Sequence, residues 1–143
     1  GGAETLREKT GAKIGIGEPD ADGLADTALN LSDMFHANIA PFNPDLTFKN
    51  GDKVTVGDIG FKVISTPGHT VGGVCYLTGD CLFSGDTLFE NSIGRTDFPG
   101  GDIKALMRSV KKLLTLPADT KVYPGHGDST TVAREKEYNI FAG

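Results

Sequence analysis

Residues 63–70 read Val63-Ile64-Ser65-Thr66-Pro67-Gly68-His69-Thr70, an apolar stretch that runs into a glycine turn carrying a histidine. Two further stretches share this design: Leu82-Phe83-Ser84-Gly85-Asp86-Thr87-Leu88 and Val122-Tyr123-Pro124-Gly125-His126-Gly127. Each predicts a strand whose C-terminal end presents a His or an Asp, and open α/β sheets bind ligands at such ends. The glycine before each of these residues allows the backbone to fold closely enough for the side chains to converge.

The side chains of His69, Asp86 and His126 are therefore candidate metal ligands. Two imidazoles and a carboxylate suit zinc or iron, because imidazole nitrogens are borderline donors and the carboxylate supplies negative charge. Taken singly, each residue is also typical of an ordinary surface turn. The joint pattern favours a metal site, since two of the three histidines share a Pro-Gly-His context. We interpret His36, which lacks that context, as a structural or surface residue.

The middle of the chain predicts mostly sheet. Strands are expected at 46–49, 53–56, 59–65, 73–77 and 81–84, with tight turns at Asn50-Gly51, Gly57-Asp58 and Thr78-Gly79-Asp80. Cys75 and Cys81 flank the last turn and could lie opposite each other on a hairpin. We interpret them as reduced, buried thiols rather than a disulfide, because free cysteine usually behaves as a small hydrophobe.

Helices are expected toward both ends of the chain. The clearest follows Asp102, an N-cap, with apolar residues at helical spacing on one face until Pro117 stops it near residue 116. The other expected elements are a helix over 3–10 with Leu6 as its main apolar contact, a strand over 13–16, a short helix within 24–35, a strand over 121–123 and a helix over 130–138.

Length and charge narrow the class of protein. A chain of 143 residues predicts one domain, residues 1–143. Fourteen basic and nineteen acidic residues give a net charge of −5, which disfavours nucleic acid and anionic membranes as partners. No apolar run is long enough for a membrane span and no targeting segment is visible, so we expect a cytoplasmic protein. Residues 15–19 lack a nucleotide-binding pattern, so no residue is assigned to an organic cofactor.

The ordered phrases of this chain resemble a known family. Thr66-Pro67-Gly68-His69-Thr70, Ser84-Gly85-Asp86-Thr87-Leu88-Phe89, Gly94-Arg95-Thr96-Asp97-Phe98-Pro99-Gly100-Gly101-Asp102 and Tyr123-Pro124-Gly125-His126-Gly127 are similar in order and spacing to the metallo-β-lactamase-fold hydrolases, specifically the compact glyoxalase II-like group. The resemblance covers essentially the whole chain. It implies an α/β fold, the αββα sandwich, with a dinuclear metal site at one end of its two sheets.

The resemblance also implies roles for the three candidate ligands. His69 would bind the first metal, His126 the second, and Asp86 would bridge both and act in catalysis. The metals are usually two zinc ions, with iron or manganese as alternatives, and a bridging hydroxide would attack a thioester carbonyl. Penicillin-cleaving members tend to place a cysteine near the position of Asp86, so an oxygen-rich site favours thioester or phosphoester hydrolysis.

One departure from the family pattern is large. The other family ligands lie in a His-x-His-x-Asp-His motif placed just before the stretch that here begins at residue 1. We therefore expect an N-terminally incomplete domain, with weak metal binding or none and little hydrolysis from these 143 residues themselves. An uncovered apolar flank would favour a homodimer or a domain-swapped dimer.

The substrate and the enzyme class leave alternatives. Arg95 is a candidate either for binding an anionic substrate or for a structural clamp, with Asp97 as its partner. The end of the chain shortly after residues 123–127 resembles the compact bacterial type without the C-terminal helical domain of glutathione-binding relatives, so we expect no fixed specificity for glutathione as the thiol carrier. The persulfide dioxygenases, iron enzymes of the same fold, share the phrase Gly94-Arg95-Thr96-Asp97-Phe98 and are an alternative. A non-catalytic fragment is the third interpretation.

Overall fold

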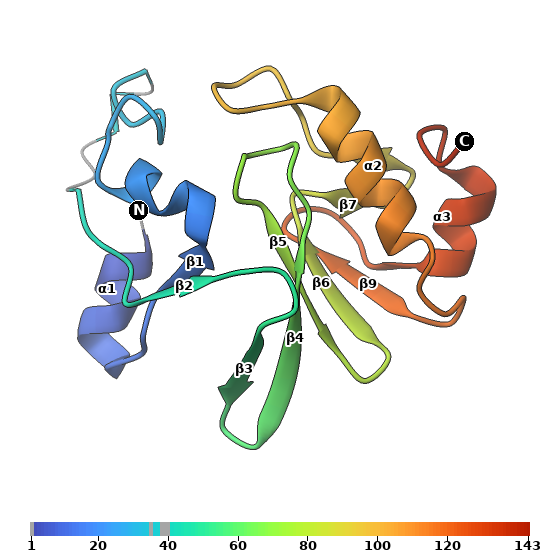
Figure 1. The fold of residues 1–143 in the computed structure, drawn as a ribbon, viewed down its shortest axis with the longest axis horizontal. Coiled ribbons are helices and arrows are strands. Elements are labelled where there is room, and N and C mark those ends of the chain that lie inside the picture. Colours follow the sequence, from blue (N-terminus) through green and yellow to red (C-terminus); the bar gives the residue numbers. More distant parts are fainter. Residues whose placement is uncertain (1, 35, 38–40) are drawn as a thin grey trace. The chain divides into compact units, whose positions relative to one another are not determined.

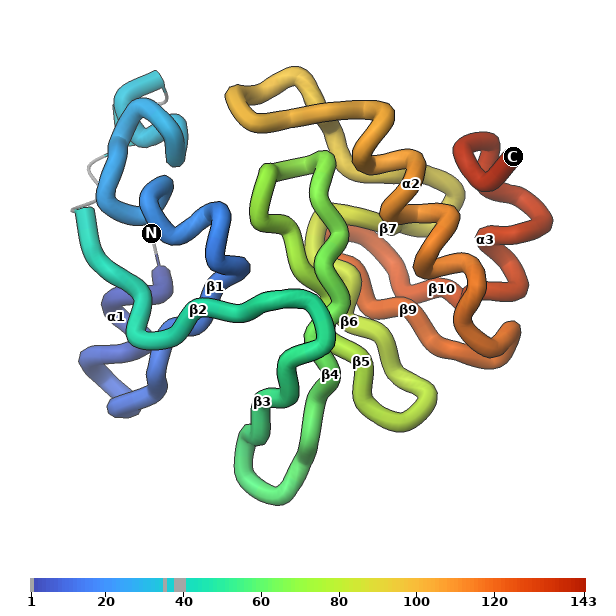
Figure 2. Tube along the Cα trace, in the orientation of Figure 1, coloured from blue at the N-terminus to red at the C-terminus, as the bar shows by residue number. Residues whose placement is uncertain are grey.

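The structure is a computed structural model that describes residues 2–34, 36–37 and 41–143. Its backbone separates into two compact units, residues 1–48 and 49–143 (Figures 1 and 2). The three predicted metal ligands and Arg95 all belong to the second unit, so the architecture of that unit determines the candidate site.

The first unit consists of short elements. Helix α1 (Gly2–Thr10) is the predicted first helix, and Gly11 follows it with a φ of 70°. The prediction that Leu6 is its apolar contact is wrong: Leu6 is exposed and α1 buries no residue. One leucine among nine residues gives no apolar stripe to bury. Strand β1 (Gly15–Gly17) pairs in parallel with β2 (Leu46–Phe48).

The short helix expected within 24–35 does not form in the described part of that stretch. The 3-10 helix η1 (Glu18–Leu24) ends where it was expected to begin, and turns follow through residue 34, while residue 35 lies outside the described residues. Asp26 Oδ1 accepts hydrogen bonds from the amides of Ala28 and Leu29, and Asn30 Oδ1 accepts one from the amide of Ser32. These side chains replace the backbone bonds that a helix would need.

The second unit is built on a six-stranded sheet with the order β10-β9-β6-β5-β4-β3. Its strands are β3 (Lys53–Val56), β4 (Ile59–Ser65), β5 (Val74–Thr78), β6 (Cys81–Gly85), β9 (Lys121–Pro124) and β10 (Thr130–Thr131). The hairpins around Gly57-Asp58 and Gly79-Asp80 are confirmed, since their flanking residues are paired in register. Of all the pairings in this sheet, only β6 with β9 is parallel.

The prediction of a hairpin turn at Asn50-Gly51 is wrong. Strand β2 pairs with β1 and not with β3. The amide of Gly51 donates to the carbonyl of Val63, and the amide of Val63 donates to the carbonyl of Asp52, both at 2.8 Å. Gly51 and Asp52 therefore extend the hydrogen-bond ladder between β3 and β4. Asn50-Gly51, a dipeptide that often closes a hairpin, leads into the sheet instead.

Both cysteines are free thiols, as the sequence predicted, but they do not lie opposite each other. Cys81 is paired with Thr78 across the hairpin, because the turn holds only two residues. Cys75 is buried, and burial raises the pKa of its thiol. Cys81 is only partly covered, so the prediction of two buried thiols holds for Cys75 alone.

Two helices cover one face of the sheet (Figure 1). Helix α2 (Ile103–Leu113) begins after Asp102, whose carboxylate accepts hydrogen bonds from the amides of Lys104 and Ala105, as the N-cap prediction requires. Helix α3 (Val132–Tyr138) begins two residues later than predicted, because residues 130–131 pair with β9. The core joins both helices to the sheet through Ile64, Cys75, Leu82, Leu88, Leu106, Val110, Leu113, Leu114, Val122 and Val132.

Sequence reasoning missed the small hairpin formed by β7 (Leu88–Phe89) and β8 (Ser92–Ile93), because it assigned no helix or strand to residues 88–101. Ile103, which belongs to the apolar residues expected on one face of α2, is exposed in the first turn. Among the described residues, no helix is long and apolar enough to cross a membrane.

Candidate functional site

The sheet topology brings the three predicted ligands to one edge. Strands β4 and β6 both run antiparallel to β5, and β6 runs parallel to β9, so β4, β6 and β9 point in the same direction. Asp86 follows β6 directly, His126 lies two residues beyond β9, and His69 lies four residues beyond β4. The three residues therefore lie beyond the C-terminal ends of strands, as predicted, while their role as metal ligands stays a prediction.

Asp86 lies between the two histidines. Its Oδ1 accepts a hydrogen bond from Nδ1 of His126 at 2.9 Å, and its Oδ2 lies 3.7 Å from Nε2 of His69. The Asp86 side chain is 29% exposed and that of His69 27%, whereas that of His126 is 78% exposed. Asp86 and His69 thus form the sheltered part of the site, and His126 lies on its solvent side.

A backbone carbonyl determines which nitrogen of His69 carries the proton. Nδ1 of His69 lies 2.8 Å from the carbonyl oxygen of Arg95, which can only accept, so Nδ1 is the donor. In the neutral ring the lone pair is then on Nε2, the nitrogen that faces Asp86. Metal-binding histidines commonly have this arrangement, with one nitrogen donating to a carbonyl and the other free to bind.

Two glycines allow other segments to approach Asp86. A Cβ atom at Gly94 would overlap the carbonyl oxygen of Asp86, and one at Gly125 would overlap its Oδ1. The residue before Asp86, Gly85, has a φ of 51°, which favours glycine. The glycine context that the sequence analysis noted at Gly85 and Gly125 thus has a physical cause, and Gly94 is an addition that sequence reasoning did not single out.

A buried chain of hydroxyl and thiol groups lies beneath the site. Thr87 Oγ1 donates to Thr66 Oγ1 at 3.1 Å, and Thr66 Oγ1 lies 3.3 Å from Cys75 Sγ. Thr66 precedes the His69 turn and Thr87 follows Asp86, so this chain connects the two segments that carry site residues. Sequence reasoning missed both threonines, although each stands in a motif with a predicted ligand, Thr87 directly after Asp86 and Thr66 three residues before His69.

Arg95 is held by its neighbours. Its Nε and Nη2 donate to the two carboxylate oxygens of Asp97 at 2.7 and 2.6 Å, and its guanidinium carbon lies 3.8 Å from the ring centroid of Phe98. The Arg95 hydrogen bonds lower the pKa of Asp97 from 3.8 to about 2. This geometry favours the clamp interpretation, while a role for Arg95 in substrate binding stays a prediction.

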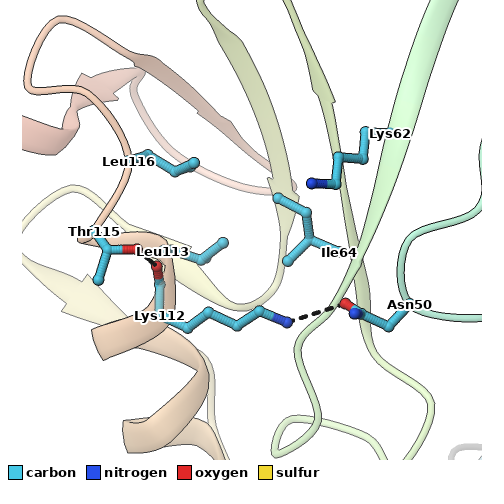
Figure 3. A pocket seen from close by; sticks show the side chains of 7 residues that line it. All are labelled: Asn50, Lys62, Ile64, Lys112, Leu113, Thr115 and Leu116. Atoms are coloured by element: carbon cyan, nitrogen blue, oxygen red, sulfur yellow. Dashed lines mark hydrogen bonds between the residues drawn. The ribbon is translucent and has the colours of Figure 1, made fainter.

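His36, which we interpreted as a structural or surface residue, is exposed in the first unit and has a φ of 50°. The second unit also contains a small pocket, drawn in Figure 3, which none of the predicted site residues lines. It has a volume of about 170 Å³ and lies where Lys112 meets Asn50; its other lining residues are Lys62, Ile64, Leu113, Thr115 and Leu116.

The three donors do not make up a metal site by themselves. The chemistry of the donors suits zinc or iron. The structure, however, places them in two pairs that share Asp86, and Nδ1 of His126 donates a hydrogen bond directly to the Asp86 carboxylate. Across residues 2–34, 36–37 and 41–143, no group of three or more His, Cys, Asp or Glu side chains is placed to hold a metal ion. The residues therefore do not fit a complete metal centre.

Known proteins are similar to this chain over most of its length. A family model described as the metallo-β-lactamase superfamily matches residues 1–126, which run through both units. An uncharacterized protein of Aquifex aeolicus is 48% identical over 103 residues, which are 70% of this chain and 49% of that protein. The matched segment thus spans about half the length of this relative.

Two relatives with descriptive names match nearly the whole chain. The probable metallo-hydrolase YqgX of Bacillus subtilis is 37% identical over 145 aligned residues, and the hydroxyacylglutathione hydrolase GloC of Haemophilus influenzae is 35% identical over 146. Each match covers 99% of this chain and 69% of the relative.

Three solved structures have the same fold over 99% of this chain. BLEG-1 B3 metallo-β-lactamase matches with a TM-score of 0.92, 36% identity and 70% of its own chain covered. TTHA1623 in a di-iron-bound form matches with a TM-score of 0.84 and 35% identity, and 70% of its chain is covered. ETHE1 from Myxococcus xanthus matches with a TM-score of 0.78 and 35% identity, and 56% of its chain is covered. These matches confirm the predicted α/β fold class of the metallo-β-lactamase proteins. Membership of the metallo-β-lactamase superfamily implies metal ions.

A family model that matches most of the chain, together with relatives of 35 and 37% identity that cover 99% of it, shows that the chain belongs to the metallo-β-lactamase superfamily.

Proposed function

We propose that this chain carries part of the active site of a metal-dependent hydrolase of the glyoxalase II-like type, which cleaves small-molecule thioesters. The observation that supports the proposal most is the placement of Asp86 between His69 and His126 at one edge of the sheet. The Haemophilus influenzae relative is named a hydroxyacylglutathione hydrolase, and this name supports a thioester as the substrate class.

The residues of this chain would contribute two adjacent metal-binding atoms. Nε2 of His69 carries a lone pair because Nδ1 donates to the Arg95 carbonyl, and Oδ2 of Asp86 lies 3.7 Å away. The hydrogen bond from His126 holds the other oxygen of Asp86, which fixes the rotation of its carboxylate. A carboxylate oxygen and a neutral imidazole nitrogen so arranged would serve as two of the ligands of a metal ion, which when bound would supply activation of a water molecule.

The test measures hydrolysis of a hydroxyacylglutathione by the 143-residue chain. A second protein, extended before residue 1 by the His-x-His-x-Asp-His segment of a relative, is assayed in parallel. We expect little hydrolysis by the chain itself and hydrolysis by the extended protein that is lost on dialysis against a chelator and restored by zinc, iron or manganese. In the extended protein, D86N should lower kcat/KM by about 100-fold or more, the loss typical of one catalytic group.

His36→Gln is the matched control, because it removes an exposed histidine of the other unit. It should leave hydrolysis unchanged, whereas His69→Gln should abolish most of it. Hydrolysis that is insensitive to D86N would contradict the proposal. A penicillin belongs in the same assay, because one similar structure is named a B3 metallo-β-lactamase; faster cleavage of the penicillin than of the thioester would replace the substrate class.

An iron-dependent persulfide dioxygenase is the second candidate function. The shared phrase 94–98 favours it, and here that phrase forms the clamp between Arg95 and Asp97 with Phe98 under the guanidinium. A similar structure that is described as di-iron-bound supports iron as a metal of such sites. Oxygen uptake with formation of sulfite from a persulfide by the extended, iron-loaded protein would favour the dioxygenase over the hydrolase.

A non-catalytic chain that forms a homodimer or exchanges segments with a second copy is the remaining candidate. Small-angle scattering over a range of concentrations separates the cases, since a dimer doubles the mass. A monomer at high concentration would exclude this candidate. A dimer whose extended form shows neither hydrolysis nor oxygen uptake would support it.

A further inference from the structure

Helix α2 and its N-cap residue hold three residues of the segment before His69. Lys112 Nζ donates to the carbonyl of Ser65 at 3.2 Å, and Ser109 Oγ donates to the carbonyl of Pro67 at 2.7 Å. The amide of Asp102, at the N-terminal end of the helix, donates to the carbonyl of Gly68 at 2.8 Å. As the segment advances toward His69, its partners move along α2 from its last turn to its first.

The spacing on the helix gives these contacts one face. Leu106, Ser109 and Lys112 are three residues apart, so their side chains form one stripe. Gly68 lies directly on this stripe, with a φ of 139°, and a Cβ atom there would overlap the backbone of Leu106. Only glycine therefore fits against Leu106 at position 68, and the backbone of the segment packs directly on the helix.

Ser109 is an unusual residue for its position. It is buried on a helix face whose other buried residues are Leu106, Val110 and Leu113. Burying a hydroxyl group among apolar side chains is unfavourable unless it forms a hydrogen bond, and the Pro67 carbonyl is the acceptor that Ser109 finds. The Ser109 hydroxyl therefore stabilises the segment that contains Pro67 and contributes no apolar packing to the core.

Lys112 ties the same segment to a second strand region. Its ammonium group donates to Asn50 Oδ1 at 3.0 Å, and that oxygen also accepts a hydrogen bond from the amide of Ser65 at 3.0 Å (Figure 3 draws the contact between Lys112 and Asn50). Both polar backbone groups of Ser65 are therefore held, one by Lys112 and one by Asn50. The end of β4 is fixed at the point where the His69 segment begins.

We propose that Ser109 and Lys112 are positioning residues for His69: they hold residues 65–68 against α2 and so determine where the His69 ring lies relative to Asp86. This proposal rests on the role of His69 in the proposed function. Neither residue touches the site itself, and both act through the backbone of the segment.

The test uses the 143-residue chain and reads positions, not activity. The ring signals of the three histidines are followed by NMR, together with hydrogen exchange of the amide of Gly68, which donates to the carbonyl of Thr70. S109A and K112M should each shift the His69 ring signal and speed exchange at Gly68 about fivefold or more, as expected for losing one hydrogen bond. The signal of His36 and the amides of the β5–β6 ladder should stay unchanged.

Two further variants serve as controls. K112R keeps a donor at the end of a long side chain and should restore the wild-type His69 signal, whereas K111M removes the same charge from the neighbouring exposed position and should change nothing. Lys112 is exposed, so K112M is not expected to prevent folding.

Unchanged His69 and Gly68 signals in both S109A and K112M would overturn the proposal. Equal acceleration of exchange at Gly68 and in the β5–β6 ladder would also overturn it, since that result describes a general loss of stability. If the extended protein fails to hydrolyse thioesters while the signals change as expected, the proposed function is wrong and the positioning of His69 by α2 stands.

Discussion

At the scale of single residues, the site depends on two glycines that have no side chain as much as on the carboxylate and imidazole groups. Asp86 can receive His126 on one side and the segment around Gly94 on the other only because no Cβ atom projects from Gly94 or Gly125. These close approaches are the residue-level reason why a carboxylate and two imidazoles from distant parts of the chain meet.

Gly94→Ala should therefore destabilise the second unit. The new methyl group overlaps the backbone oxygen of Asp86, which cannot move as a flexible side chain would, so we expect a loss of about 1–3 kcal/mol in the free energy of unfolding. Urea denaturation measures it. Gly60→Ala is the control, because a Cβ there meets open space; equal losses in both variants would show that close packing at Asp86 is not the cause.

The pKa of Asp97 provides a second residue-level prediction. The hydrogen bonds from Arg95 lower it to about 2, so the ion pair is complete above pH 3.8 and is lost as the pH falls through about 2. A carboxyl titration by NMR should show this value, and Arg95→Gln should return it toward 3.8. Asp102, whose pKa is lowered mainly by the amide of Ala105, should keep its low value in that variant.

At the scale of elements, helix α3 holds the β7–β8 hairpin through one buried carboxylate. Glu135 is fully buried and accepts hydrogen bonds from the amide of Asn91, the hydroxyl of Thr130 and the side-chain amide of Asn139. Asn139 in turn donates to the carbonyl of Ser92. The hairpin leads directly to Gly94 and Arg95, so α3 supports one border of the site as α2 supports another.

Glu135→Leu should cost about 2–4 kcal/mol of stability, because it removes the acceptor of three hydrogen bonds, two of them donated by the buried residues Thr130 and Asn139. Glu135→Gln should cost less, since its amide oxygen can accept from Asn91 and Asn139 while its NH₂ group donates to the Thr130 hydroxyl. Urea denaturation ranks the two. Glu137→Leu, on the exposed side of α3, should change stability by no more than about 0.5 kcal/mol; a Leu variant of Glu135 as mild as this one would refute the argument.

Many of the helices and hairpins could be predicted from the sequence, because a few neighbouring residues determine where they begin or turn. Asp102 starts a helix because its carboxylate satisfies free amides, and Gly57-Asp58 closes a hairpin because both flanking strands alternate. Asn50-Gly51 misled for a physical reason: the partner of β2 is β1, more than 25 residues away, and no local pattern records it. In the site, the shared sheet edge was predictable, whereas the Nδ1 contact of His126 depends on tertiary packing.

At the scale of the whole molecule, the two units differ in how much they bury. Every buried hydrophobic residue of the described chain lies between Val63 and Val132, in the second unit. The first unit therefore has little apolar burial of its own among its described residues, and regions with few buried contacts open at low cost in free energy.

Limited proteolysis should accordingly cut within residues 1–48 before it cuts within 49–143. The expected product is a fragment that retains β3 to α3, identified by its intact mass. Amides of α1 should likewise exchange with solvent faster than those of the β4–β5 ladder. First cleavage inside the six-stranded sheet would show that burial does not determine which unit opens first.

The common direction of β4, β6 and β9 has a consequence for how such a protein can be remodelled. The side chains that keep the second unit folded lie between the sheet and its helices, while the residues proposed for chemistry sit on connections that leave one edge. Connections of this kind can be exchanged or lengthened with modest thermodynamic cost. New substrate preferences could therefore be grafted onto this edge, by evolution or by a protein engineer, while the scaffold below is inherited unchanged.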